Sequence, residues 1–196
     1  SGNWIGPPEY KIQEMRVNYK TSKWNLRKSP GDILPKNTFF INLNLSEKKL
    51  LYNMRYNTRY NIRMAEKKGI QIQEYGIEHI KDWYQLYRET ALRHHLPLKS
   101  EAFFFNILKN QDNDKKGVHV KMLMAEWNNT FLASMFLVLS HKRGTYLYGA
   151  SSTDKKKLTA SYLLQWESIK IAKKWGCSEY DMFGSAPNLN QNHPLH

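Results

Sequence analysis

The sequence is poor in cysteine, in acidic residues and in long hydrophobic runs. Cys177 is the only cysteine among 196 residues, so no disulfide can form within the chain and a cysteine-rich zinc site is excluded. The longest apolar run, residues 131–139, is far shorter than the roughly 20 residues of a membrane-spanning helix, and no N-terminal segment resembles a signal peptide. We therefore expect a soluble, cytoplasmic protein whose basic surface allows peripheral contact with the inner membrane face.

The shortage of acidic residues points to an anionic partner. Lys and Arg number 30 against 17 Asp and Glu, which gives a formal net charge of +13. Such a charge indicates nucleic acid, a phosphorylated substrate or an anionic membrane surface. The content of 41% hydrophobic and 13% aromatic residues argues against disorder, and the length suits one domain or a domain with a large appendage. A basic RNA-binding module without catalysis also fits these values.

Common catalytic and metal-binding motifs are absent as well. The sequence contains no G-x-S-x-G, no H-E-x-x-H, no P-loop and no convincing Cys/His pair. His94 and His95 are adjacent, so on a helix they point to different sides and favour a surface or capping role over metal binding. We expect no metal site.

The most informative stretch that is present runs from Ser46 to Gly69 and is predicted to form one helix. Ser46 is suited to cap its N-terminus, and Gly69 lies where a left-handed residue commonly ends a helix. A stripe at spacings of three and four predicts the buried face, formed by Leu51, Met54, Thr58, Ile62 and Ala65.

A second stripe on the same helix is basic and consists of Arg55, Arg59, Arg63 and Lys67. Like charges four residues apart repel, which indicates that an anion lies against them. Three tyrosines run beside them, at positions 52, 56 and 60, and together the two rows suit phosphates and bases. The stripe therefore predicts a surface that binds an anionic partner with phosphates and bases or sugars; the alternative is a solvated basic face whose tyrosines cover a neighbouring domain.

The order of predicted elements indicates the fold class. Hydrophobic periodicity predicts a strand at 38–43, the helix just described, a strand at 70–73, two helices, three strands, a helix at 159–175 and a strand at 179–183. The three central strands are expected at 118–127, 131–139 and 145–150 and to form an antiparallel meander. This order describes an α/β (α+β) sandwich with a mixed, mostly antiparallel sheet flanked by helices, in which the last helix brings a parallel strand pair.

Two blocks of sequence resemble the Fem family of peptidoglycan-bridge aminoacyltransferases. The first comprises PKNT at 35–38, FFINL at 39–43 and TRYNIRMAEKKG at 58–69, and the second comprises YGASS at 148–152, LLQWE at 163–167 and YDMFG at 180–184. The resemblance implies the Gcn5-related N-acetyltransferase-like fold, which the family carries twice. Residues 1–69 would then be the closing part of a first such domain, and residues 70–196 most of a second that lacks its last elements.

The resemblance also implies the reaction and its site residues. Fem enzymes transfer an amino acid from aminoacyl-tRNA to the stem-peptide amine of a muramyl-peptide precursor, either nucleotide- or lipid-linked. By this resemblance the basic stripe at residues 55, 59, 63 and 67 would bind the tRNA. Thr90, Arg93 and Tyr148 resemble the precursor-binding residues, although Tyr148 also fits a half-buried strand residue. Asp181 is a candidate proton acceptor, with a carboxylate that fixes the strand end as the alternative. Because the family continues beyond the end of this sequence, we expect the chain alone to be inactive.

The segment after the third meander strand argues against an acyl-CoA cofactor. Acyl-CoA-dependent members of the fold bind pyrophosphate there with a glycine-rich loop, whereas residues 151–160 contain no glycine. Lys155, Lys156 and Lys157 instead suit a large phosphodiester, and the resemblance names it as aminoacyl-tRNA; a solvated lysine loop is the alternative. We expect no cofactor. A small-molecule N-acyltransferase remains as a further alternative function.

Overall fold

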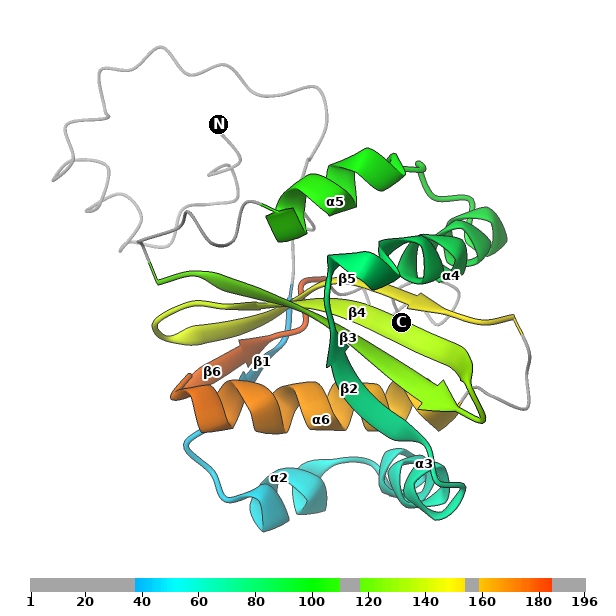
Figure 1. Cartoon of the computed structure of the whole chain (residues 1–196). Helices are drawn as coiled ribbons and strands as arrows, with labels where there is room; N and C mark the ends of the chain where they lie inside the picture. Colours follow the sequence, from blue (N-terminus) through cyan, green and yellow to red (C-terminus); the bar gives the residue numbers. More distant parts are fainter. Residues whose placement is uncertain (1–37, 110–116, 154–158, 185–196) are drawn as a thin grey trace, which may run out of the picture.

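The computed structural model describes residues 38–109, 117–153 and 159–184 (Figure 1). Its elements, in chain order, are β1 (Phe40–Asn42), α2 (Glu47–Asn53), α3 (Tyr56–Lys67), β2 (Gln71–Tyr75), the 3-10 turn η2 (Ile77–His79), α4 (Ile80–Arg93), α5 (Glu101–Lys109), β3 (His119–Trp127), β4 (Thr130–Leu139), β5 (Arg143–Ser151), α6 (Thr159–Trp175) and β6 (Glu179–Asp181). None of the helices in these ranges combines the length and the apolar composition needed to cross a bilayer.

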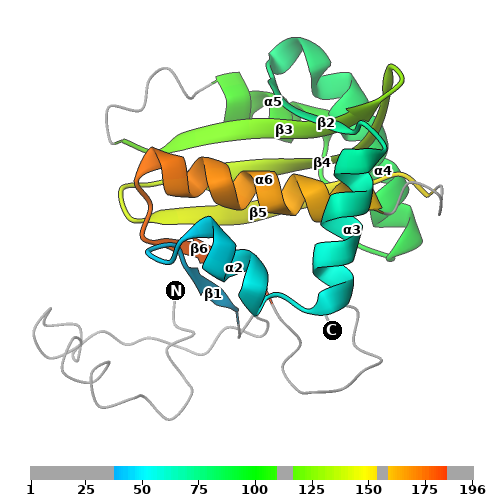
Figure 2. The same cartoon turned by 90° about the horizontal axis from the view of Figure 1, so that it is seen from below.

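The strands form one six-stranded sheet in the order β1-β6-β5-β4-β3-β2. All neighbours are antiparallel except β5 and β6, which are parallel because α6 carries the chain back across the sheet. Helices α4 and α5 cover one face, and α2, α3 and α6 cover the other (Figures 1 and 2). The predicted fold class, a mostly antiparallel sheet flanked by helices with a parallel pair at the end, is confirmed.

Each face of the sheet has its own hydrophobic core. Under α4 and α5, Trp83 and Phe104 are fully buried and their ring centroids lie 4.1 Å apart, with Phe136 of β4 edge-on to Trp83. On the opposite face, α6 packs between the sheet and α3, and Figure 2 shows α3 beside the start of α6. The described part of residues 1–69 thus shares a sheet and a core with later residues. The division at 69/70 stays a prediction about the longer protein.

The single helix predicted for 46–69 is wrong, because the structure has two helices with a break between them. Met54 and Arg55 are extended, with ψ of 153° and 149°, so α2 ends and α3 starts anew. The guanidinium of Arg59 donates to the carbonyl oxygens of Tyr52 and Met54, which the break leaves without helical partners. The Ser46 hydroxyl caps α2, as predicted, by accepting from the Lys49 N–H at 3.3 Å, and Gly69 has a φ of 76°.

The buried stripe is confirmed in α3, where Ile62 and Ala65 are buried, whereas α2 buries Leu50 instead of Leu51. The shift follows from the break, because the two helices have separate axes and therefore separate inward faces. The remaining expected strands and helices agree with the structure to within a few residues, and α6 has the predicted bounds.

A close contact between Gly144 of β5 and Ala172 of α6 allows a test of this packing. A Cβ added at Gly144 would lie 2.6 Å from the Ala172 Cβ, so Gly144→Ala should lower the free energy of unfolding by about 1–3 kcal/mol. Ala172→Gly alone should cost about 1 kcal/mol of helix stability. Because the double variant removes the clash, its loss should be smaller than the sum of the two single losses by about 0.5–3 kcal/mol. Urea unfolding measures all three, and strictly additive losses would contradict the contact.

Candidate active site

The strand β5 has an open edge next to the end of β6. β6 pairs with β5 only from Arg143 to Thr145, and no described strand pairs with that edge after Thr145. The cause lies at Asp181, whose Oδ1 accepts from the Thr38 hydroxyl at 2.5 Å and from the Phe183 N–H at 2.9 Å. Phe183 adopts a left-handed φ of 55°, and this turn ends the strand. The side of β5 that follows is therefore left exposed.

The register shows which backbone groups lie on that edge. The Ser152 N–H donates to the Leu132 carbonyl at 2.8 Å, so these two residues form a hydrogen-bonded pair between β4 and β5. Because bonded and non-bonded pairs alternate in an antiparallel ladder, the N–H and C=O of Ser151 and of Gly149 point away from β4. At Ser151 the Thr90 hydroxyl occupies both groups, accepting at 2.9 Å and donating at 3.1 Å.

A cavity of about 220 Å³ adjoins this edge. Its walls come from α4, β4, β5 and the start of α6, and the lining residues are Thr90, Arg93, His94, Ala133, Ser134, Met135, Tyr146, Gly149, Ala150, Ser151, Ser161, Leu164 and Gln165. Most of the polar lining groups are hydroxyls, an amide or backbone, and Arg93 is the formal cation among them. The cavity therefore suits a small polar or anionic group.

Tyr146 lies across Gly149 within this cavity. A Cβ at Gly149 would be 1.8 Å from the Tyr146 hydroxyl oxygen, so only glycine admits the phenol there. A β-bulge makes this possible: Phe136 pairs with Tyr148 and Leu137 with Tyr146, which leaves residue 147 unpaired and turns the two tyrosines to opposite faces. Burial raises the pKa of Tyr146 above its ordinary value, which keeps the phenol neutral and able to donate a hydrogen bond.

Arg93 is held at the mouth of the cavity by the end of β5. Its guanidinium donates to the Ser151 carbonyl at 3.2 Å and to the Ser151 hydroxyl at 3.0 Å. The side chain is exposed, so it can also meet an anion from solvent. Thr90 and Arg93, predicted together from the sequence, are thus brought to one place.

Ser134 contributes a buried hydroxyl to the same cavity. The residue is 1% exposed, and its Oγ has no hydrogen-bond partner in the described part of the chain. A buried polar atom of this kind costs stability unless a ligand or water satisfies it. Ser134 faces the α4 side of the sheet with its register partner Ala150, whereas Tyr146 faces the α6 side. The cavity therefore reaches both faces around the open edge.

Two other predicted site residues lie outside this cavity. Tyr148 packs edge-on against Phe103 and Phe104, with centroid distances of 6.0 and 5.2 Å. Its pKa is raised above the ordinary value, mainly by burial and secondarily by the nearby Tyr87. Asp181 is 7% exposed and holds the strand end through the bonds described above, with Arg143 at 3.8 Å from its second oxygen. These contacts agree with the alternatives given from the sequence: a half-buried strand residue for Tyr148, and a carboxylate that fixes the strand end for Asp181.

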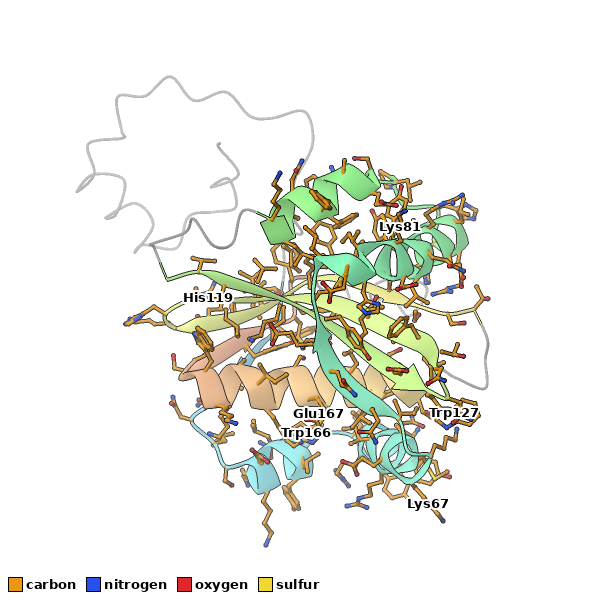
Figure 3. The ribbon with its side chains drawn as sticks, in the orientation of Figure 1. Lys67, Lys81, His119, Trp127, Trp166 and Glu167 are labelled. Carbon is orange, nitrogen blue, oxygen red and sulfur yellow. The ribbon has the colours of Figure 1, made fainter. Side chains whose placement is uncertain are left out.

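The predicted tRNA-binding stripe is only partly available on the surface. Arg59 is bound to the two carbonyls at the helix break, whereas the structure records no ion pair for Arg55 or Arg63 with any described residue. The tyrosines are exposed, and the rings of Tyr56 and Tyr60 stack at 6.5 Å. In Figure 3, Lys67 points away from the sheet at the end of α3, near Trp127. Residues 155–157 lie outside the described residues.

Apart from Thr90 and Arg93, the residues that line the cavity were not predicted as site residues; among them are Ser134, Tyr146, Gly149 and Gln165. Tyr146 and Tyr148 are two residues apart, which in a regular strand predicts the same face, and the bulge that separates them has no sequence signal. The dipeptide Tyr148-Gly149 was part of the family motif, but it did not indicate that another tyrosine needs the glycine. A group of three or more metal-ligating side chains is not found in the described ranges.

Thr90 provides a test of the edge. Thr90→Val keeps the shape of the side chain but leaves the Ser151 N–H without a partner and the Ser151 C=O with Arg93 alone, so the free energy of unfolding should fall by about 1–3 kcal/mol. Thr90→Ser retains the hydroxyl and should recover most of the loss. Chemical unfolding of the three proteins is the measurement. Equal stability of the valine and wild-type proteins would show that the hydroxyl does not hold this edge.

Among solved structures, the fold is similar to that of a Fem protein. The crystal structure of FemX superposes with a TM-score of 0.73 at 17% identity, covering 85% of this chain and 57% of that chain. The C-terminal domain of a putative lysylphosphatidylglycerol synthetase from Agrobacterium fabrum gives a TM-score of 0.54 at 9% identity, covering 76% of this chain and 46% of that one. At these identities the likeness concerns the fold alone.

Curated relatives and a family model add the sequence comparison. Lipid II:glycine glycyltransferases of Staphylococcus haemolyticus strain JCSC1435 and Staphylococcus epidermidis strain ATCC 35984 are each 20% identical, over 82% and 90% of this chain. The chain spans about half of their length, 53% and 56%. The model of the FemAB family matches residues 23–128 and 110–196. The chain therefore belongs to the FemAB family, the group of peptidoglycan-bridge transferases that its motifs resemble.

Proposed function

We propose that this chain belongs to an enzyme that transfers an amino acid from aminoacyl-tRNA to the stem-peptide amine of a peptidoglycan precursor. The observation that carries the proposal is the open edge of β5 at Gly149, with Tyr146 across it and Arg93 at the mouth of the cavity. The curated relatives are named lipid II:glycine glycyltransferases, which supports a precursor as the acceptor. Because the chain spans about half of those relatives, the activity belongs to the complete protein.

An aminoacyl ester fits the backbone of one strand residue. It presents an α-ammonium group and a carbonyl group on either side of one carbon atom, as a neighbouring strand residue presents its N–H and C=O. In our proposal the Gly149 carbonyl accepts from the α-ammonium, and the Gly149 N–H donates to the ester carbonyl. This recognition uses groups that every aminoacyl ester has.

The transfer itself is an ester aminolysis. The acceptor amine attacks the ester carbonyl, the new C–N bond forms, the C–O bond to the ribose breaks, and the proton lost by the amine balances the one gained by the ribose oxygen. Negative charge develops on the carbonyl oxygen during attack, and donors preorganised toward that oxygen lower the barrier. We assign this role to the Gly149 N–H and to the phenol of Tyr146, which its raised pKa keeps protonated.

The precursor is proposed to approach from the α4 side. Arg93 is the cation there and suits a phosphate or carboxylate of the precursor, while Thr90 and Tyr148 are further proposed contacts. For Asp181 we adopt the alternative that the sequence left open: its carboxylate accepts two hydrogen bonds that end β6 and so keeps the edge of β5 accessible. In this assignment Asp181 positions the site and takes no proton.

The tRNA is proposed to lie against the opposite face of the sheet. The exposed basic and aromatic surface of α2 and α3 offers Arg55, Arg63 and Lys67 to phosphates, and its tyrosine rings to bases or sugars. Lys155, Lys156 and Lys157 follow β5 in sequence and precede α6, and they are proposed to extend this surface toward the site.

A transfer assay with the complete gene product tests the function. Radiolabelled aminoacyl-tRNA and either form of the precursor should yield precursor that carries the label. Tyr146→Phe, which removes one hydroxyl oxygen, should lower the turnover rate by about 10²-fold with little change in KM, because its contact strengthens in the transition state.

Tyr162→Phe is the matched control for that assay, since Tyr162 lies on α6, is 40% exposed and does not line the cavity. It should transfer at the wild-type rate. Acyl transfer from acetyl-CoA but not from aminoacyl-tRNA would replace the proposal with a small-molecule N-acyltransferase. Binding of tRNA without any transfer would favour an RNA-binding module.

The salt dependence of tRNA binding separates Arg63 from Arg59. Arg63→Gln should lower the slope of log affinity against log salt by about 0.7–0.9, as expected for one lost phosphate contact, and should leave the fold intact. Arg59→Gln should instead lower the free energy of unfolding by about 1 kcal/mol, because two carbonyls lose their donor. If Arg59→Gln lowered the salt slope and Arg63→Gln lowered the stability instead, Arg63 would not face RNA.

A further inference from the structure

The end of α4 and the connection from α4 to α5 expose three leucines. Leu92, Leu96 and Leu98 are 69%, 52% and 50% exposed, and they lie within seven residues of one another in sequence. The segment runs along the outer side of α4 and α5, away from the sheet (Figure 1, upper right). Single exposed leucines are common on protein surfaces, but three in one short segment mark an interaction site.

The segment is held in place by the core beneath it. The Tyr87 hydroxyl donates to the Pro97 carbonyl and accepts from the Lys99 N–H, both at 3.3 Å, and the Tyr84 hydroxyl donates to the Lys99 carbonyl at 3.1 Å. His95 has a left-handed φ of 52°, and the Leu96 N–H returns to the Ala91 carbonyl at 2.9 Å. These bonds fix the backbone in a shape that leaves the leucines outside.

The charge around the leucines is basic. Residues 92–100 contain Arg93, Lys99 and two histidines but no aspartate or glutamate. The Lys99 ammonium lies over the ring of Phe103, 5.6 Å from its centroid, and Phe103 is itself partly exposed. The nearest acidic residues in sequence, Glu89 and Glu101, are half-buried at the flanks. Exposed apolar side chains beside two cations, in a segment without a carboxylate, match a bilayer surface that carries anionic headgroups.

We propose that the segment 92–100 docks on an anionic lipid bilayer, with Leu96 and Leu98 inserted among the lipids and Lys99 at the level of the headgroups. A bilayer fits this segment because exposed leucines stand beside Arg93 and Lys99 and the segment contains no carboxylate, so its charge complements anionic headgroups.

The surface bears on the acceptor, and this step rests on the proposed function. Arg93 and His94 line the cavity and lie between Leu92 and Leu96 in sequence, so the mouth of the cavity adjoins the docking segment. A membrane at this surface would present a lipid-linked precursor to the α4 side. The tRNA surface of α2 and α3 would remain in the aqueous phase, because it lies on the other face of the sheet.

Vesicle binding by the complete protein tests the docking without any substrate. The vesicles are made of zwitterionic phospholipid with an added anionic phospholipid. Leu96→Gln combined with Leu98→Gln should weaken binding by about tenfold or more, because both apolar side chains lose their burial in the lipid. Tyr60→Gln is the matched control: Tyr60 is 51% exposed but lies on α3, and its replacement should leave vesicle binding unchanged.

A polarity-sensitive fluorophore supplies the second measurement. Attached at Leu98→Cys, it should shift to the blue when vesicles are added, and the same probe at Tyr60→Cys should not; Cys177 is buried and does not compete for the label. Equal shifts at both positions, no shift at residue 98, or unchanged binding by the leucine variant would overturn the proposal. Transfer activity is measured separately, so vesicle binding without transfer would reject the proposed function and leave the docking standing.

Discussion

The turn at the end of β6 is the constraint on which the candidate site depends. Asp181 accepts from the Thr38 hydroxyl and the Phe183 N–H, and Phe183 adopts a left-handed conformation. Had β6 continued, it would have covered the edge of β5, and the backbone groups at Gly149 would have been used within the sheet. The Asp181 carboxylate therefore shapes the candidate site without lining its cavity.

The sheet also separates two surfaces of different character. On the side of α2 and α3 lie exposed tyrosines and arginines suited to RNA, and on the side of α4 and α5 lie leucines and cations suited to a bilayer. The cavity reaches both sides around the open edge of β5. In our account this arrangement lets a polar, macromolecular donor and a membrane-held acceptor meet at one residue, Gly149, without competing for the same face.

The sequence predicted the layers of the fold well, because burial in helices and strands leaves periodic patterns. Ile62 and Ala65 were found by spacing alone, and so were the bounds of α6. The break at Met54–Arg55 was missed, since the residue that stabilises it, Arg59, reads as one more member of a basic stripe. Its contact with two carbonyls is tertiary and leaves no periodic signal.

The site was less accessible to sequence reasoning. Thr90 and Arg93 came from family resemblance, and the structure brings them together at Ser151. Tyr146 was missed because a bulge reverses its face, and Ser134 because a buried serine in a strand has no pattern of its own. Groups whose position depends on strand register or on an unpaired strand edge can be identified only from the three-dimensional structure. Groups on a helix face can be predicted from their spacing in the sequence.

The most direct test of the central claim is a crystal structure of the complete protein with a stable aminoacyl-adenosine analogue in which an amide replaces the ester. The account predicts that the analogue lies along the open edge of β5, with its carbonyl oxygen within hydrogen-bonding distance of the Gly149 N–H and near the Tyr146 hydroxyl. An analogue bound elsewhere, or another strand of the protein paired with this edge, would contradict the account.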